Sequence, residues 1–73
     1  MKKTLIKSDV AGVVNEICFS KGDIVKKGES LLFIESMKME IPIEAPFDSE
    51  IEEIFIEKDE VISQNQPLLT LKS

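Results

Sequence analysis

Short clusters of β-branched, leucine and phenylalanine residues alternate with polar, turn-forming segments along the whole chain. The apolar clusters cover residues 13–19, 31–34, 51–56 and 68–71. Between them lie pairs of residues that are typical of turns, namely Gly22-Asp23, Lys27-Gly28, Asp59-Glu60 and Gln64-Asn65. Short apolar runs bounded by such residues predict β-strands. The pattern therefore predicts an all-β fold.

The two halves of the chain resemble one another. They align without gaps at an offset of 37 residues, so that Glu16-Ile17 matches Glu53-Ile54 and Leu31-Leu32 matches Leu68-Leu69. Conservative replacements of apolar residues connect these identities. A repeat of this kind predicts two halves of the same structure, related by a twofold axis.

The apolar spacing changes at the same place in both halves. Three apolar residues in each half are spaced three and then two positions apart: Val14, Ile17 and Phe19, and Ile51, Ile54 and Ile56. A β-bulge at this point would explain the break in the strand period. Residues 48–58 also show some helical spacing, but the matching first half contains Gly12 and Val13, which disfavour a helix. We therefore expect strands in both halves.

Three glycines of the first half are replaced in the second. Gly12, Gly22 and Gly28 match Ser49, Asp59 and Asn65. Asp and Asn tolerate a positive φ better than most other residues, so we expect at least the last two positions to keep the same turns. The alternative is that these residues only form exposed polar loops.

The segment that connects the halves contains the run Glu35-Ser36-Met37-Lys38-Met39-Glu40. Two of the three methionines of the chain flank its lysine, and the third is Met1. The repeat predicts a hairpin over residues 34–41 with Met37-Lys38 at its tip. A two-residue turn exposes a lysine to many directions of approach while the strands fix its position. Lys38 is therefore a candidate functional residue on architecture alone.

Composition excludes several classes of function. The 73 residues are enough for one domain, which we assign to residues 1–73. The chain has no His and only one cysteine, Cys18, so it cannot assemble a His-based catalytic triad or a usual zinc site. The net charge of -5 argues against a nucleic-acid partner. We expect no catalytic residue and no metal ligand, and a partly buried, apolar role for Cys18, which matches Phe55 in the repeat.

Membrane and export signals are weak. The start of the chain resembles a signal peptide until Lys7 interrupts the apolar run. No stretch approaches the ~20 apolar residues of a membrane span. We therefore expect a cytoplasmic protein without membrane insertion. Met1 suggests a complete small protein, and a segment of a larger chain is the alternative.

The run around Lys38 resembles the attachment site of biotinyl domains, the biotin carboxyl carrier modules of biotin-dependent carboxylases. Gly22-Asp23-x-Val25-x-x-Gly28 and Ala45-Pro46 also match this family, and the resemblance covers about residues 11–71. It implies a flattened eight-stranded β-barrel, or barrel-sandwich hybrid, of two pseudo-twofold halves with the modified lysine on a hairpin tip. The sequence departs from the family pattern where glycine is more usual, at Ser49, Asp59 and Asn65.

The resemblance also implies a function. A biotin protein ligase would attach biotin covalently to Lys38, and the chain would be a carrier without catalytic activity. The arm would carry CO2 as carboxybiotin from a biotin carboxylase to a carboxyltransferase, in an acyl-CoA or oxo-acid carboxylase or decarboxylase. The flanking residues that would serve recognition are Glu35, Ser36, Met37, Met39 and Glu40.

Two alternatives come from related domains. One is a lipoyl carrier of the 2-oxo acid dehydrogenase type, but such domains typically have Asp before and Ala after the lysine. Met37 and Met39, together with Glu35, are similar to the biotin form instead. The other alternative is an unmodified relative used as a scaffold. The two methionines also allow two interpretations, since they could fill gaps at the end of the barrel or contact a partner.

Overall fold

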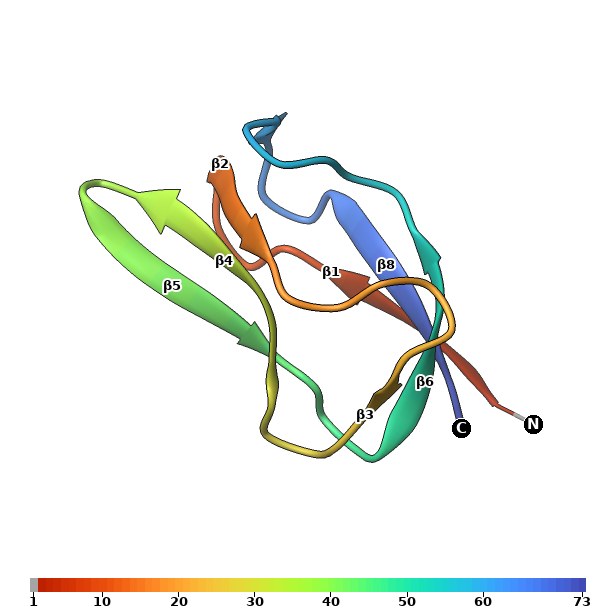
Figure 1. Cartoon of the computed structure of the whole chain (residues 1–73). Helices are drawn as coiled ribbons and strands as arrows, with labels where there is room; N and C mark the ends of the chain where they lie inside the picture. The colour runs from red at the N-terminus through yellow and green to blue at the C-terminus, as the bar shows by residue number, and fades with distance from the viewer. Residues whose placement is uncertain (1) are drawn as a thin grey trace.

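Eight short β-strands form two antiparallel sheets (Figure 1). The computed structural model describes residues 2–73, and Met1, the expected initiator, lies outside the described residues. One sheet has the order β1-β8-β6-β3 and is called the terminal sheet here, because β1 and β8 lie nearest the chain ends. The hairpin sheet has the order β5-β4-β2-β7. The strands are β1 (Lys3–Lys7), β2 (Gly12–Ile17), β3 (Ile24–Val25), β4 (Ser30–Ser36), β5 (Met39–Glu44), β6 (Ser49–Ile54), β7 (Val61–Ile62) and β8 (Pro67–Lys72).

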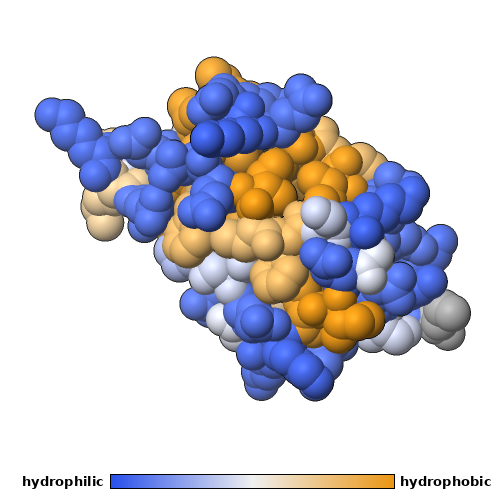
Figure 2. All heavy atoms as spheres, viewed as in Figure 1, coloured by the Kyte–Doolittle hydropathy of each residue, from blue (hydrophilic) through white to orange (hydrophobic). Residues whose placement is uncertain are grey.

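Aliphatic side chains fill the space between the two sheets. Val14 and Ile34 of the hairpin sheet and Ile51 and Leu71 of the terminal sheet are at most 1% exposed. They belong to one cluster with Val25, Leu31, Leu32, Ile43, Ala45, Ile56, Ile62, Leu68 and Leu69. Figure 2 shows hydrophobic side chains gathered in the middle of one face, with hydrophilic side chains around them. Burial of this apolar surface, at about 25 cal/mol per Å², is the main force that holds the sheets together.

The halves repeat one another down to single hydrogen bonds. At the offset of 37 residues, β2 to β4 match β6 to β8, and β5 matches β1. Gly22 N donates to Ile51 O at 2.8 Å, and at the matching positions Asp59 N donates to Val14 O at 2.7 Å. Each half places its short strand, β3 or β7, in the sheet of the other half. The predicted fold class, a flattened eight-stranded barrel-sandwich hybrid of two related halves, is confirmed, with its two sheets hydrogen-bonded as separate ladders.

Both predicted bulges are present. The register of β2 against β4 shifts at Asn15, and the register of β6 against β8 shifts at Glu52, the matching position. The helical alternative for residues 48–58 is wrong, since β6 covers Ser49–Ile54. The extra residue of a bulge turns its side chain away from the regular alternation, so Asn15 and Glu52 are free to make contacts along the outer face.

The replaced glycines keep their turns. Gly22 and Gly28 have φ angles of 93° and 89°, and Asp59 and Asn65 have φ angles of 72° and 68°. The prediction that Asp and Asn preserve these turns is therefore confirmed, because both residue types tolerate the left-handed region. Ser49, the third replacement, lies in β6.

Strand ends differ from expectation, and the apolar clusters did not predict β1 or the two-residue strands β3 and β7. β2 ends at Ile17 and β6 ends at Ile54, two residues before the predicted ends at Phe19 and Ile56. Phe19 and Ile56 still pack on or in the core, so their apolar character reflects burial and not pairing. The pattern did not predict β1, because residues 2–8 match residues 39–45 only when the repeat is continued across the ends of the chain.

Candidate functional site

The hairpin between β4 and β5 has a two-residue turn at its tip. Glu35 pairs with Glu40 and Ser36 pairs with Met39, which leaves Met37 and Lys38 as the turn. Their φ angles are 53° and 66°. Positive φ at both central positions defines a type I′ turn, which matches the twist of the strands it joins. The predicted hairpin with Met37-Lys38 at its tip is confirmed.

Met37 and Lys38 are unusual residues for this backbone. Six residues of the described chain have a positive φ, and the other four are glycine, aspartate or asparagine. A type I′ turn favours Asn-Gly, and a non-glycine residue in the left-handed region costs of order 1–3 kcal/mol. Strain of this kind is typical of functional sites, because a residue whose side chain is needed for function can occupy a backbone conformation that does not suit it.

The side chains at the tip are exposed. Met37 is 91% exposed and Met39 is 65% exposed, although methionine side chains are apolar. The interpretation that they fill gaps at the end of the barrel is therefore wrong. Lys38, Glu35 and Glu40 are exposed as well, and Ser36 is half-buried. The tip thus combines a primary amine with two flexible apolar side chains that are available to a partner.

Carboxylates flank the lysine on one face of the hairpin sheet. Glu35 lies directly opposite Glu40, and Val13 of β2 lies directly opposite Glu35. These three residues form a row on the outer face, because the next row contains the buried Val14 and Ile34. Two like charges directly opposite one another are unfavourable, so this pair is not explained by hairpin stability.

Asn15 is a contact of this site that the sequence did not indicate. Its side-chain Nδ2 donates a hydrogen bond to Glu40 Oε2 across β4. The spacing that predicted the bulge at this position was a signal for an outward side chain, but it did not identify the partner. The carboxylate of Glu40 on β5 is therefore held by a side chain of β2.

Cys18 lies outside the β2 strand and is exposed, so the expectation of a partly buried side chain is wrong. The matching residue Phe55 is itself 52% exposed, which explains the error. Although the side chain as a whole is exposed, the protein removes some water from around its sulfur, and this desolvation raises the pKa of the Cys18 thiol; the nearby carboxylates Glu16 and Glu40 raise it further. A raised pKa keeps the thiol protonated and makes it a poor nucleophile at neutral pH.

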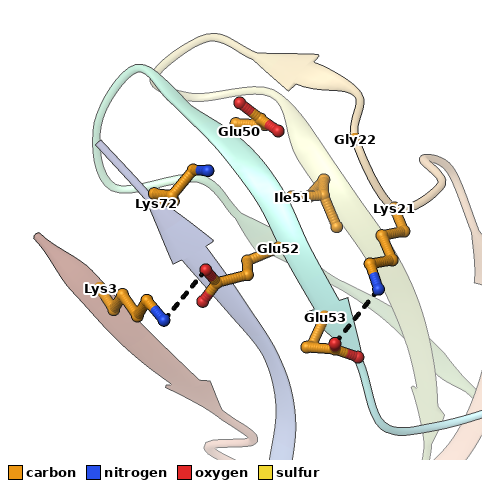
Figure 3. Close-up of a pocket in the computed structure, with 8 residues that line it drawn as sticks. All are labelled: Lys3, Lys21, Gly22, Glu50, Ile51, Glu52, Glu53 and Lys72. Carbon is orange, nitrogen blue, oxygen red and sulfur yellow. Dashed lines mark hydrogen bonds and ion pairs between the residues drawn. The ribbon is translucent and has the colours of Figure 1, made fainter. Parts of the chain in front are cut away.

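A shallow pocket occurs elsewhere, on the terminal sheet (Figure 3). It contains two ion pairs of 3.3 Å, Lys3 with Glu52 and Lys21 with Glu53, and none of the hairpin residues.

Among residues 2–73, no cluster of His, Cys, Asp and Glu side chains could hold a metal ion. In the same residues there is no helix that is long and apolar enough to span a membrane. The candidate site is therefore a protrusion and not a cleft.

Residues 4–71 match a family model described as "Biotin-requiring enzyme", of the biotin/lipoyl type. The chain belongs to this family. This biotinyl domain is 33% identical over 57 residues to the biotinylated protein TB7.3 homolog of Mycobacterium leprae, covering 78% of this chain and 80% of that protein. It is 43% identical over 51 residues to the biotin carboxyl carrier protein of acetyl-CoA carboxylase of Streptococcus pyogenes, covering 70% and 31%.

Solved structures share the fold of this biotinyl domain. A single-chain, multi-domain long-chain acyl-CoA carboxylase matches 96% of this chain with a TM-score of 0.91 and 24% identity. The urea carboxylase of Kluyveromyces lactis matches 97% with a TM-score of 0.89 and 20% identity. The chain spans 7% and 6% of these two proteins. It also spans only 9% of a curated relative, the methylcrotonoyl-CoA carboxylase subunit alpha of Dictyostelium discoideum.

Proposed function

We propose that this protein is a biotin carboxyl carrier and that Lys38 carries the covalently attached biotin. The observation that carries the proposal is the type I′ turn, where Met37 and Lys38 occupy a backbone suited to Asn-Gly. A family match over residues 4–71 supports biotin as the attached group, as do relatives named as biotin carriers.

The residues at the tip fit this group. Attachment needs a primary amine that a partner enzyme can surround, and Lys38 is exposed at the end of a hairpin. The amine would lose a proton and attack the carbonyl carbon of an activated biotinyl adenylate, forming an amide as AMP leaves. We expect the ligase to supply the base, since the chain contains no histidine. Glu35, Ser36, Met37, Met39 and Glu40 would form the surface that the ligase recognises.

Bound biotin supplies a carrier for CO2 at the end of a long flexible arm. The strands β4 and β5 hold the base of this arm in one place, while the arm moves between a biotin carboxylase and a carboxyltransferase. Tethering makes each transfer depend on an effective concentration instead of free diffusion. The chain would act without catalytic residues, as one domain over residues 1–73, in the cytoplasm.

The test is the intact mass of the protein after co-expression with a biotin protein ligase and excess biotin. The parent chain should gain one biotinyl group, and Lys38→Arg, which keeps the charge, should gain none. Lys3→Arg is the control. Lys3 lies in β1, the strand that matches β5 in the repeat, and this variant should still be modified completely. A parent chain that a competent ligase leaves unmodified contradicts the proposal. Modification by a lipoate ligase would then indicate a lipoyl carrier.

A further inference from the structure

Asn15 connects two strands that do not pair with one another. The sheet order is β5-β4-β2, and the hydrogen bond from Asn15 Nδ2 to Glu40 Oε2 passes over β4. Twenty-five residues separate the two partners in the sequence. Asn15 reaches this far because it is the extra residue of the β2 bulge.

Glu40 has a neutral hydrogen-bond partner in this contact. Asparagine is a neutral donor, and neither Glu35 nor Glu40 takes part in an ion pair within residues 2–73. Lys38, the residue to be modified, is the only basic residue between Lys27 and Lys58 in the sequence. The amide thus fixes the orientation of a carboxylate without neutralising it.

The terminal sheet contains the same bridge with different chemistry. Lys3 of β1 matches Glu40, and Glu52, the bulge residue of β6, matches Asn15. Lys3 Nζ lies 3.3 Å from Glu52 Oε1, so this bridge joins opposite charges (Figure 3). Topology therefore accounts for a contact at this place in each half, but it does not account for an uncompensated carboxylate in only one of them.

We propose that Asn15 is a positioning residue that holds the Glu40 carboxylate for a cationic side chain of the ligase that modifies Lys38. The inference rests on the proposed function and adds a residue outside the hairpin to the recognition surface. A side chain that is already ordered loses less conformational entropy when a partner binds it. Losing Asn15 should therefore weaken docking and leave the chemical step nearly unchanged.

The test is the steady-state kinetics of biotinylation of the full chain by a biotin protein ligase, with biotin and ATP. Asn15→Ala and Asn15→Asp should each raise KM for the carrier roughly three- to tenfold, the size expected for one hydrogen bond to a charged group, with kcat changed less than about twofold. Asn15→Asp keeps the shape of the side chain but cannot donate. Higher salt should shrink the difference, because the docking contact is ionic.

A double-mutant cycle separates positioning from a merely structural role. If Asn15 acts through Glu40, Asn15→Ala should have no further effect in a Glu40→Ala background. The matched control is Glu52→Ala, which removes the equivalent bridge of the terminal sheet and should leave KM within about twofold of the parent. Unchanged KM in both Asn15 variants, or additive effects in the cycle, would overturn the inference while the parent remains a carrier. A parent that is not biotinylated at all overturns the proposed function as well.

Discussion

At one end of the barrel the Met37-Lys38 turn joins β4 to β5, and at the other end the equivalent strands β8 and β1 carry the two termini (Figure 1). Lys2 and Ser73 exchange backbone hydrogen bonds of 3.0 and 2.9 Å there, as Ser36 and Met39 pair at the hairpin. The two ends thus share one backbone design. The comparison shows that strand pairing, register and bulge position are the same in both halves, although the side chains on the outer faces differ.

The outer rows of the two sheets differ in charge. Val13, Glu35 and Glu40 of the hairpin sheet match Glu50, Lys72 and Lys3 of the terminal sheet. The terminal row contains both signs, one glutamate and two lysines, and its Lys3 forms an ion pair with Glu52, whereas the hairpin row is acidic or apolar. The hairpin row therefore presents two carboxylates without an ion-pair partner among residues 2–73, close to the exposed amine of Lys38.

The largest expected difference concerns Gly12 and its match, Ser49. A Cβ added at Gly12 would collide with the backbone oxygen of Glu35 and would lie 2.9 Å from Ile34 Cγ2, whereas Ser49 already has a Cβ. Gly12→Ala should lower the free energy of unfolding by about 1–3 kcal/mol, through overpacking against β4. Ser49→Ala, which loses one hydrogen bond to Phe47 O, should cost about 0.5–1.5 kcal/mol.

Urea denaturation of both variants measures this difference. If the two variants lose the same free energy of unfolding, β4 must move aside to accommodate a Cβ at Gly12. That result would contradict the prediction, which rests on the close approach of Gly12 to Glu35.

An intermediate effect on the free energy of unfolding is expected when the hairpin turn receives an asparagine and the turn at Asn65 receives a methionine. Met37→Asn should raise the free energy of unfolding by about 0.5–1 kcal/mol, because asparagine tolerates a positive φ and the methionine side chain buries little surface. Asn65→Met should lower it by a similar amount. Thermal melts of the two variants check the signs. A destabilised Met37→Asn chain would show that the methionine supports the hairpin and is not kept for function.

The smallest effect concerns Cys18, whose thiol is influenced by the carboxylates Glu16 and Glu40. Because slight desolvation and the carboxylates Glu16 and Glu40 raise the pKa of its thiol, alkylation by iodoacetamide should begin at a higher pH than in an unstructured peptide. Glu40→Gln removes one negative charge, lowers this pKa toward the ordinary value and should speed alkylation at pH 8. Lys3→Gln, at the equivalent position of the terminal sheet, is the control and should leave the rate unchanged. Identical rates for Glu40→Gln and the parent would contradict the electrostatic cause.

The repeat explains why much of this structure could be predicted from the sequence. Turn residues such as Asp59 and Asn65 act locally, and the bulges follow from a spacing of a few residues, so both were predictable. Contacts that depend on the order of strands in a sheet were not. The hydrogen bond from Asn15 to Glu40 requires that β4 lie between β2 and β5, and no short-range pattern indicates this order.

The errors have a related cause. Cys18 was expected to be partly buried by comparison with Phe55, but the chain leaves the sheet after Ile17 and both side chains face solvent. Likewise, β1 was missed because its match to β5 appears only when the chain ends are treated as neighbours. Lys38 itself was placed correctly on its turn, since the hairpin lies at the boundary of the duplicated unit.

The exchange of β3 and β7 between the sheets has a consequence for folding. β7 pairs with β2 and β8 pairs with β1, so the ladders join segments from opposite parts of the sequence. The long stretches of chain between these paired strands must close into loops before either sheet is complete. Topologies with such long-range pairing fold slowly compared with helical domains of the same size. A ribosome that has released only the first half has therefore released no foldable unit. The lysine must wait for the last strand before it is displayed on a rigid hairpin.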